Sequence, residues 1–280
     1  MRKRKVILIS VCLLCLLLCA GLLFLDLEQS ESQDRTVEQQ ETLAHLWDVS
    51  WYDEALNEYV ISSKEQLYGF ADLSQSTNFA GKTIKLGGDI VVNEGEAAEW
   101  EKEAPELEWI AIHQFAGVFD GQGYTISGLY ARASTEALGM FATTEQSCVI
   151  KNLQIKNSYF QGKTKEGIGG IVGNGSGAFE KIYCDTIIDG LGYHCGGIIG
   201  IAQDGTHISE CWYEGNVLAK GDSGGIIGCF AGGEGSIRHS LNNAEVTTSS
   251  RRRSGTATGG LIGLCKGDVE VEDSLNAGHI

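Results

Sequence analysis

A glycine-bounded pattern repeats through the second half of the chain: two glycines, two aliphatic residues and a third glycine. Clear copies occupy residues 169–173, 196–200, 224–228 and 259–263, and a degenerate copy occupies 139–141. Counted on the second glycine of each clear copy, successive copies lie 27, 28 and 35 residues apart. A unit this short cannot bury its own apolar face, so the copies are predicted to stack and share one core.

The apolar segments of each repeat predict β-strands rather than helices. Each is two to five residues long, rich in isoleucine and valine, and bounded by glycine or asparagine, whereas a helix needs about ten or more periodic residues. Stacked strands lie ~4.8 Å apart. We interpret the doubled glycines as corners that need either a positive φ or a close approach of two backbones. The repeat therefore predicts an all-β solenoid.

A second series of short segments lies between the glycine copies, at residues 182–184, 210–212, 239–241 and 273–275. We align Cys184 with Cys211, Ser240 and Ser274, which gives steps of 27, 29 and 34 residues that follow the first series. This alignment predicts that Cys184 and Cys211 stack near the Cα separation of a disulfide, with an unoxidised pair as the alternative. The even number of cysteines beyond the N-terminal segment permits disulfides without determining their pairing: Cys148, Cys184, Cys195, Cys211, Cys229 and Cys265.

The longest step between glycine copies contains residues 247–258, which we interpret as one enlarged loop. Its three consecutive bases, Arg251, Arg252 and Arg253, form a basic patch on a chain whose formal net charge is −16. The patch is a candidate site for an anionic wall polymer, and a solvated loop tip is the alternative. The overall acidity argues against nucleic acid as a partner.

The N-terminal segment, residues 1–25, predicts a membrane signal anchor. Four bases precede an apolar run from Val6 to Leu25 in which Ser10 is the clearly polar side chain. At 1.5 Å per residue the run spans about 30 Å, the thickness of a bilayer core. The flanking bases predict an extracytoplasmic location for everything that follows. A cleaved signal peptide, which would give a secreted protein, is the alternative. Residues 26–46 are polar and are predicted to form a stalk.

The folded part is predicted to occupy residues 47–280 and to begin with a short helical cap. Ser63 and Gln66 have the spacing of a capping box, and the apolar residues that follow predict a helix over 63–74. Strands are predicted at residues 59–62, 83–86, 89–93 and 109–112. Residues 94–108 contain seven glutamates and are predicted to form an exposed acidic insertion.

The glycine copies resemble the GLUG-motif repeat family of bacterial surface proteins, and residues 119–130 resemble the first coil of pectin-lyase-like β-helices. The resemblance covers about residues 47–280. It implies a right-handed parallel β-helix at the cell surface, with an incomplete last coil that begins at Asp273. The family motif is structural and carries no catalytic site. Such repeats also accompany immunoglobulin-cleaving metallopeptidases, but their zinc signature, His-Glu-x-x-His, is absent from this sequence.

Residue patterns point to binding rather than catalysis. The six histidines are dispersed without metal-ligand spacing, and Asp120 lacks the second carboxylate that glycosidase chemistry needs, so it is interpreted as a turn residue. No catalytic residue, metal ligand or cofactor is predicted. Aromatic side chains on a solenoid flank can stack on sugars or anchor a protein, and core packing is the alternative for each. The candidates are Tyr159, Phe160, Tyr183, Trp212 and Tyr213, and we select Tyr183, Trp212 and Tyr213.

We therefore predict a non-enzymatic, adhesin-like or scaffold module of the cell surface. Its predicted partner is a cell-wall or host glycan, or a surface protein. A β-helix carbohydrate-active enzyme of the lyase or hydrolase type is one alternative. A purely structural part of a larger surface protein is the other.

Overall fold

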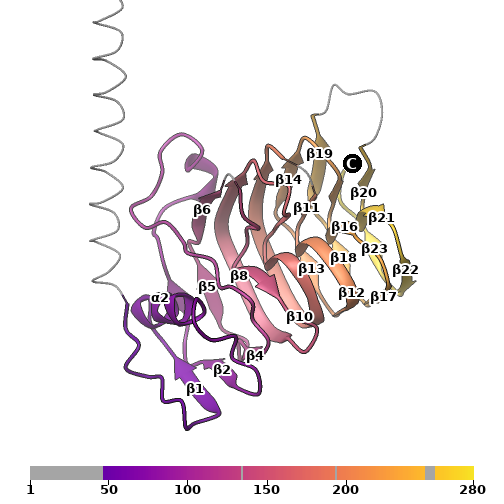
Figure 1. The fold of residues 1–280 in the computed structure, drawn as a ribbon. Coiled ribbons are helices and arrows are strands. Elements are labelled where there is room, and N and C mark those ends of the chain that lie inside the picture. The colour runs from indigo at the N-terminus through magenta and orange to yellow at the C-terminus, as the bar shows by residue number, and fades with distance from the viewer. Residues whose placement is uncertain (1–46, 134, 193, 250–255) are drawn as a thin grey trace, which may run out of the picture. The chain divides into compact units, whose positions relative to one another are not determined.

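The computed structural model describes residues 47–133, 135–192, 194–249 and 256–280, which form one parallel β-solenoid of about 7 turns (Figure 1). The prediction of an all-β solenoid is confirmed. The predicted anchor at residues 6–25, the stalk at 26–46 and Arg251 to Arg253 lie outside the described residues. Within the described ranges, no helix is long and apolar enough to cross a membrane.

The strands pair in parallel from coil to coil and form two sheets. The first coils contain β1 (Glu58–Ile61), β2 (Thr83–Leu86), β3 (Ile90–Val91), β4 (Val118–Asp120), β5 (Thr125–Ser127), β6 (Tyr130–Ala133) and β7 (Phe141–Thr144). Three long strands follow the coil around its corners: β8 (Val149–Gly162), β10 (Val172–Gly190) and β12 (Ile199–Ser209). The later coils contain β13 (Trp212–Tyr213), β14 (Asn216–Ala219), β16 (Ile227–Phe230), β17 (Glu234–Arg238), β18 (Leu241–Asn242), β19 (Glu245–Thr248), β21 (Ile262–Cys265), β22 (Asp268–Glu272) and β23 (Leu275–Asn276). The smaller sheet contains β9 (Ile168–Gly169), β11 (Cys195–Gly196), β15 (Ser223–Gly224) and β20 (Thr258–Gly259).

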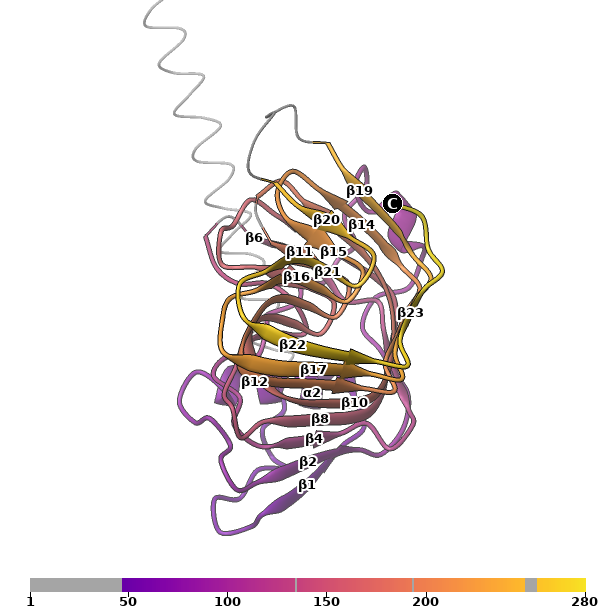
Figure 2. The ribbon, with the colours of Figure 1, turned by 90° about the vertical axis from the view of Figure 1, so that its right-hand side faces the viewer.

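The core consists of columns of inward-facing side chains, one residue from each coil. On the face where β1, β2, β4, β8, β10, β12, β17 and β22 are stacked (Figure 2), one such column is fully buried along six coils. Its members are Ile84, Phe119, Ile150, Phe179, Ile208 and Ile237. Because every member contacts the ones above and below it, the column is a continuous apolar core.

The outward side of the same face carries charges that alternate in sign along the stacking direction. The column contains Lys85, Asp120, Lys151, Glu180, Ser209, Arg238 and Glu272. Lys151 Nζ lies 3.7 Å from Asp120 Oδ2, and Arg238 Nε lies 3.4 Å from Glu272 Oε2. The Arg238–Glu272 pair is exposed and contributes little to stability, whereas Asp120 in the other pair is buried. Their main effect is to favour this register, because a slip by one residue turns every side chain to the opposite face.

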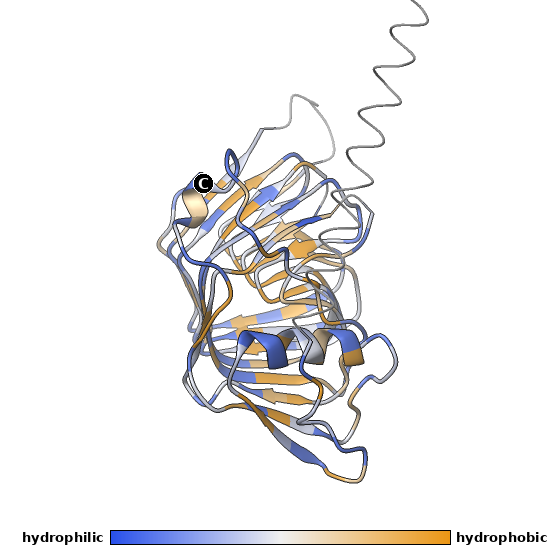
Figure 3. Ribbon diagram, turned by 90° about the vertical axis from the view of Figure 1, so that its left-hand side faces the viewer, coloured by the Kyte–Doolittle hydropathy of each residue, from blue (hydrophilic) through white to orange (hydrophobic). Residues whose placement is uncertain are grey.

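The predicted helical cap is confirmed as α2 (Lys64–Leu73). The backbone N–H of Gln66 donates to Ser63 Oγ at 3.3 Å, and Gln66 Oε1 accepts from the backbone N–H of Ser62 at 2.8 Å. The helix buries Phe70, whose ring stacks on Phe119 with 6.0 Å between centroids and meets Phe79 edge-on at 4.9 Å. In Figure 3, α2 lies across the first coils. The helix therefore covers the N-terminal end of the core.

The acidic segment 94–108 is more ordered than the sequence suggested. It contains the 3₁₀ helix η1 (Ala97–Glu99) and packs Ala97 and Trp100 against the outward rings of Tyr130 and Tyr159. The prediction of a strand at residues 109–112 was wrong. Ile112 forms only an isolated bridge to Phe141. The segment is held to the next coil by the indole of Trp109, whose Nε1 donates to Met140 O at 3.1 Å.

The alignment of the second repeat series was wrong by two residues at its first member. Cys184 pairs with Tyr213, while Ile182 is level with Cys211. Cys184 and Cys211 therefore do not stack, and the six cysteines within the described residues are free thiols. Burial raises the pKa of the Cys184 and Cys211 thiols to about 12. Both behave as small core residues rather than as reactive thiols.

The doubled glycines of the repeat serve close packing rather than a positive φ. A Cβ on Gly197 would lie 2.2 Å from Tyr213 Cδ1 and 2.3 Å from Gly225 O, well inside van der Waals contact. The second glycines of the neighbouring copies face similar contacts, Gly225 with Asn242 and Gly260 with Asn276. Glycine is therefore needed wherever this turn of one coil meets an inward side chain.

We expect Gly197→Ala to lower the free energy of unfolding by about 1–3 kcal/mol, because the added methyl group overpacks the core. Gly88→Ala is the matched control, since a Cβ there meets no atom within 4 Å, and it should change stability by less than about 1 kcal/mol. Urea unfolding followed by circular dichroism measures both. Equal stability of the two variants would contradict the packing role of Gly197.

Candidate functional site

One corner of the solenoid has a left-handed backbone in six successive coils. The φ angles there lie between 45° and 54°, at Gln122, Asn152, Lys181, Glu210, His239 and Asp273. This conformation is uncommon for residues other than glycine, asparagine and aspartate. From Asn152 to Asp273 stacking repeats the same backbone shape, so the corner keeps its shape although its side chains differ. The turn at Gln122 is two residues longer.

The strand that follows this corner is only two residues long in the later coils, and its first residue points outward. In β13, Trp212 is 43% exposed, whereas the next residue, Tyr213, is fully buried. The strand register places one outward residue per coil in a column that we call the outward stripe: Thr125, Gln154, Tyr183, Trp212, Leu241 and Leu275.

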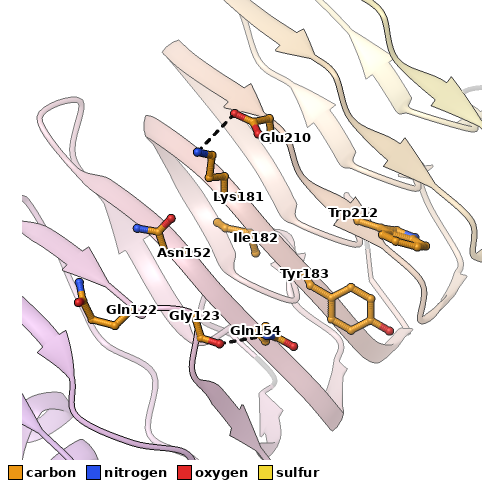
Figure 4. A pocket seen from close by; sticks show the side chains of 9 residues that line it. All are labelled: Gln122, Gly123, Asn152, Gln154, Lys181, Ile182, Tyr183, Glu210 and Trp212. Atoms are coloured by element: carbon orange, nitrogen blue, oxygen red, sulfur yellow. Dashed lines mark hydrogen bonds and ion pairs between the residues drawn. The ribbon is translucent and has the colours of Figure 1, made fainter.

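An open groove of ≈680 Å³ lies between the left-handed corner and the outward stripe (Figure 4). Its lining residues are Gln122, Gly123, Asn152, Gln154, Lys181, Ile182, Tyr183, Glu210 and Trp212. Two of the predicted binding residues, Tyr183 and Trp212, are therefore brought together. Tyr213 is not part of the groove, because its side chain lies in the core and its hydroxyl donates to Thr186 O at 2.8 Å.

The rings of Tyr183 and Trp212 form the aromatic part of the groove. Their centroids are 5.8 Å apart and their planes meet at 78°. The Tyr183 hydroxyl donates to Glu214 Oε2 at 2.6 Å, and Lys156 Nζ lies 5.3 Å from the centre of the same ring. Burial and the Glu214 carboxylate raise the pKa of Tyr183. The phenol thus stays neutral, and both its orientation and its proton are fixed by Glu214.

Hydrogen-bonding side chains make up the remainder of the groove, and sequence reasoning missed them. Gln154 Nε2 donates to Gly123 O at 3.0 Å, and Lys181 Nζ lies 3.9 Å from Glu210 Oε1 (Figure 4). Asn152 Nδ2 donates to Asp120 Oδ1 at 2.9 Å. These groups lie next to the aromatic rings only because consecutive coils stack. An alignment on the left-handed corner would have placed Asn152, Lys181 and Glu210 in one column and Gln154 in the column of the rings.

Asp120 is held in a structural role. Burial tends to raise the pKa of its carboxyl, but hydrogen bonds from Asn152 and Gln122, together with the charge of Lys151, bring that pKa below its ordinary value. Its side chain belongs to the turn, as the sequence predicted. Within the described parts of the chain, no group of three or more His, Cys, Asp or Glu side chains could hold a metal ion.

The geometry defines the class of protein: a parallel β-solenoid with an open aromatic groove on one flank. No family model matches the sequence, so membership of the GLUG family stays a prediction. The chain is 29% identical to an immunoglobulin A1 protease of Streptococcus pneumoniae over 72% of its own length and 10% of that protein. It is 32% identical to halomucin of Haloquadratum walsbyi over 31% of its own length and 1% of that protein.

A solved structure of a candidate immunoglobulin A1 protease from Bacteroides ovatus is also similar, with a TM-score of 0.49 and 16% identity. The likeness covers 82% of this chain and 77% of that one. Of its two curated relatives, the protease and halomucin, the chain spans about a tenth or less of the full length.

Two carboxylates lie one coil apart at the edge of the site, on Asp185 and Glu214. Burial raises the pKa of Asp185, and the charge of Glu214 raises it further. A carboxyl whose pKa is higher in the folded than in the unfolded state costs stability when ionised, and this cost disappears as the pH falls below the unfolded value of about 4. Ionised Asp185 therefore destabilises the fold at neutral pH.

We expect Asp185→Asn to raise the free energy of unfolding at pH 7 and to lose this advantage near pH 3.5. The Asp185 carboxylate accepts a hydrogen bond from the backbone N–H of Asn157. The side-chain oxygen of an asparagine at position 185 can accept the same hydrogen bond. Glu136→Gln, which removes one charge from an exposed position, is the control and should change stability little. If Asp185→Asn is less stable than the native protein at pH 7, burial and the charge of Glu214 are not what determines the pKa of Asp185.

Proposed function

We propose that this solenoid is an extracytoplasmic, surface-displayed module that binds a glycan chain in the groove. One observation carries the proposal: Tyr183 and Trp212 stand on consecutive coils of a ≈680 Å³ groove beside amide and charged side chains. Sugar rings present C–H groups on their faces and hydroxyls on their edges. Aromatic rings suit the former, and a few convergent polar groups suit the latter.

The groove crosses several coils, so the proposed glycan lies along the solenoid axis. Each further coil offers a new set of contacts ~4.8 Å away. Gln154 and Asn152 precede the aromatic rings in this direction, and Lys181 and Glu210 flank them. These residues supply both donors and acceptors, as recognition of hydroxyl groups requires.

The groove supports binding better than it supports turnover. Glu210 is the one carboxylate among the lining residues, whereas glycoside hydrolysis ordinarily uses a pair. One relative is named as a protease, but the matched region is 10% of that protein. We propose that this region serves recognition rather than peptide cleavage. The proposal includes the right-handed GLUG-type helix and display through residues 6–25, with secretion after signal cleavage as the alternative.

The test is binding of the full chain, in detergent, to an array of neutral, amino and acidic oligosaccharides. We expect selective binding that Trp212→Ala weakens by at least about tenfold, as loss of a tryptophan anchor commonly does. Trp47→Ala is the matched control, because Trp47 is a similarly exposed tryptophan at 38% outside the groove, and it should bind normally.

Two outcomes would refute the glycan proposal. An array without binding to a correctly folded protein would favour a scaffold or protein-binding role. Equal losses in the Trp47 and Trp212 variants would show that binding does not depend on the groove.

A further inference from the structure

The outward stripe changes its chemistry along the solenoid. It begins with the polar residues Thr125 and Gln154, continues with the aromatic pair in the groove, and ends with Leu241 and Leu275. Leu275 is 60% exposed, more than Trp212 at 43%. Three coil steps separate Tyr183 from Leu275, about 14 Å at the usual strand spacing. The apolar surface therefore extends two coils beyond the groove.

Packing of the core does not explain why the two leucines point outward. The residue after each leucine faces inward and is an asparagine, Asn242 or Asn276. Asn242 is fully buried, and its Nδ2 donates to Asn276 Oδ1 at 2.7 Å. Polar residues inside and leucines outside reverse the usual alternation of a half-buried strand. An aligned apolar patch at the surface, continuous with a groove, is typical of a binding site.

We propose that the ligand is a glycoconjugate whose carbohydrate lies in the groove and whose aliphatic aglycone lies on Leu241 and Leu275. This inference rests on the proposed glycan function. A leucine offers neither a hydrogen bond nor an aromatic face, so contact with a sugar contributes little binding free energy. Burial of the leucine under an alkyl chain removes apolar surface from water and favours binding. Because the stripe is continuous with the groove, one ligand can reach both parts.

The rims of the stripe keep this ligand in line. On the corner side, His239 Nε2 lies 3.4 Å from Asp273 Oδ2, level with the two leucines. On the other side, Asn243 Nδ2 donates to Glu214 Oε1 at 3.3 Å. The apolar strip is thus one residue wide between polar borders, which suits a single extended chain rather than a broad protein surface.

The test uses the oligosaccharide that binds best on the array, prepared as a methyl glycoside and as an octyl glycoside. Calorimetric titration of the full chain, below the micellar concentration of the octyl compound, should show the octyl glycoside binding at least about tenfold more tightly. In the double variant Leu241→Ser, Leu275→Ser, both compounds should bind with the affinity of the methyl glycoside. Leu218→Ser, at a leucine that is 43% exposed on β14 and outside the stripe, should keep the full difference.

The outcomes separate this inference from the one on which it rests. Equal affinity for the two glycosides in the native protein would overturn the aglycone site and leave glycan binding intact. An octyl advantage that survives in the double variant would place the alkyl chain elsewhere and would also overturn the inference. Binding of neither glycoside would refute the proposed function itself. Circular dichroism of each variant confirms that the fold is retained.

Discussion

In-register stacking of the coils is the constraint on which the whole structure depends. Each coil bonds only to its neighbours, so residues at the same position of successive coils form a column. The side chains of one column must therefore pack or hydrogen-bond with one another. Aliphatic and aromatic residues meet this condition by burial, as Phe119 and Ile150 do. A polar column meets it differently. Asn242 remains buried because the next coil presents Asn276 as its hydrogen-bond partner, which removes the cost of burying an unpaired amide.

The same constraint explains why some of the groove's polar side chains lie at a strained corner. Stacking holds residues such as Lys181 and Glu210 in the left-handed region. For an isolated residue with a Cβ, this conformation costs about 1 kcal/mol or more of free energy. The coils above and below supply the hydrogen bonds that offset this cost, such as that from Glu210 N to Arg238 O. Since the backbone shape is fixed by its neighbours, outward side chains of different kinds, such as Lys181 and Glu210, are tolerated at this corner.

The sequence revealed the repeat, the all-β solenoid and the capping helix because these follow from local patterns of glycine, β-branched residues and Ser63, whereas the parallel arrangement was implied by the family resemblance. It also selected Tyr183 and Trp212 as candidate binding residues, and the fold brings these two side chains together. It could not align Cys184 correctly, because the true landmark is a corner of four unlike residues, Lys181, Glu210, His239 and Asp273, that share only a φ angle. The same error hid the inward phase of Tyr213. The polar groups of the groove, such as Gln154, become neighbours of the rings only through stacking.

The shape of this surface comes from side-chain size together with one wider turn, because four residues separate Asp120 from Thr125 and only two separate their partners Lys151 and Gln154. The groove is open at Gly123, where a Cβ would meet no atom within 4 Å, and it is closed on the far side by Trp212, which stands two coils beyond Gln154. The wider turn at one end and the large side chain of Trp212 at the other therefore enclose a concave site between them. In such an architecture a single substitution on the outward stripe reshapes the site while the inward columns, and with them the fold, stay unchanged.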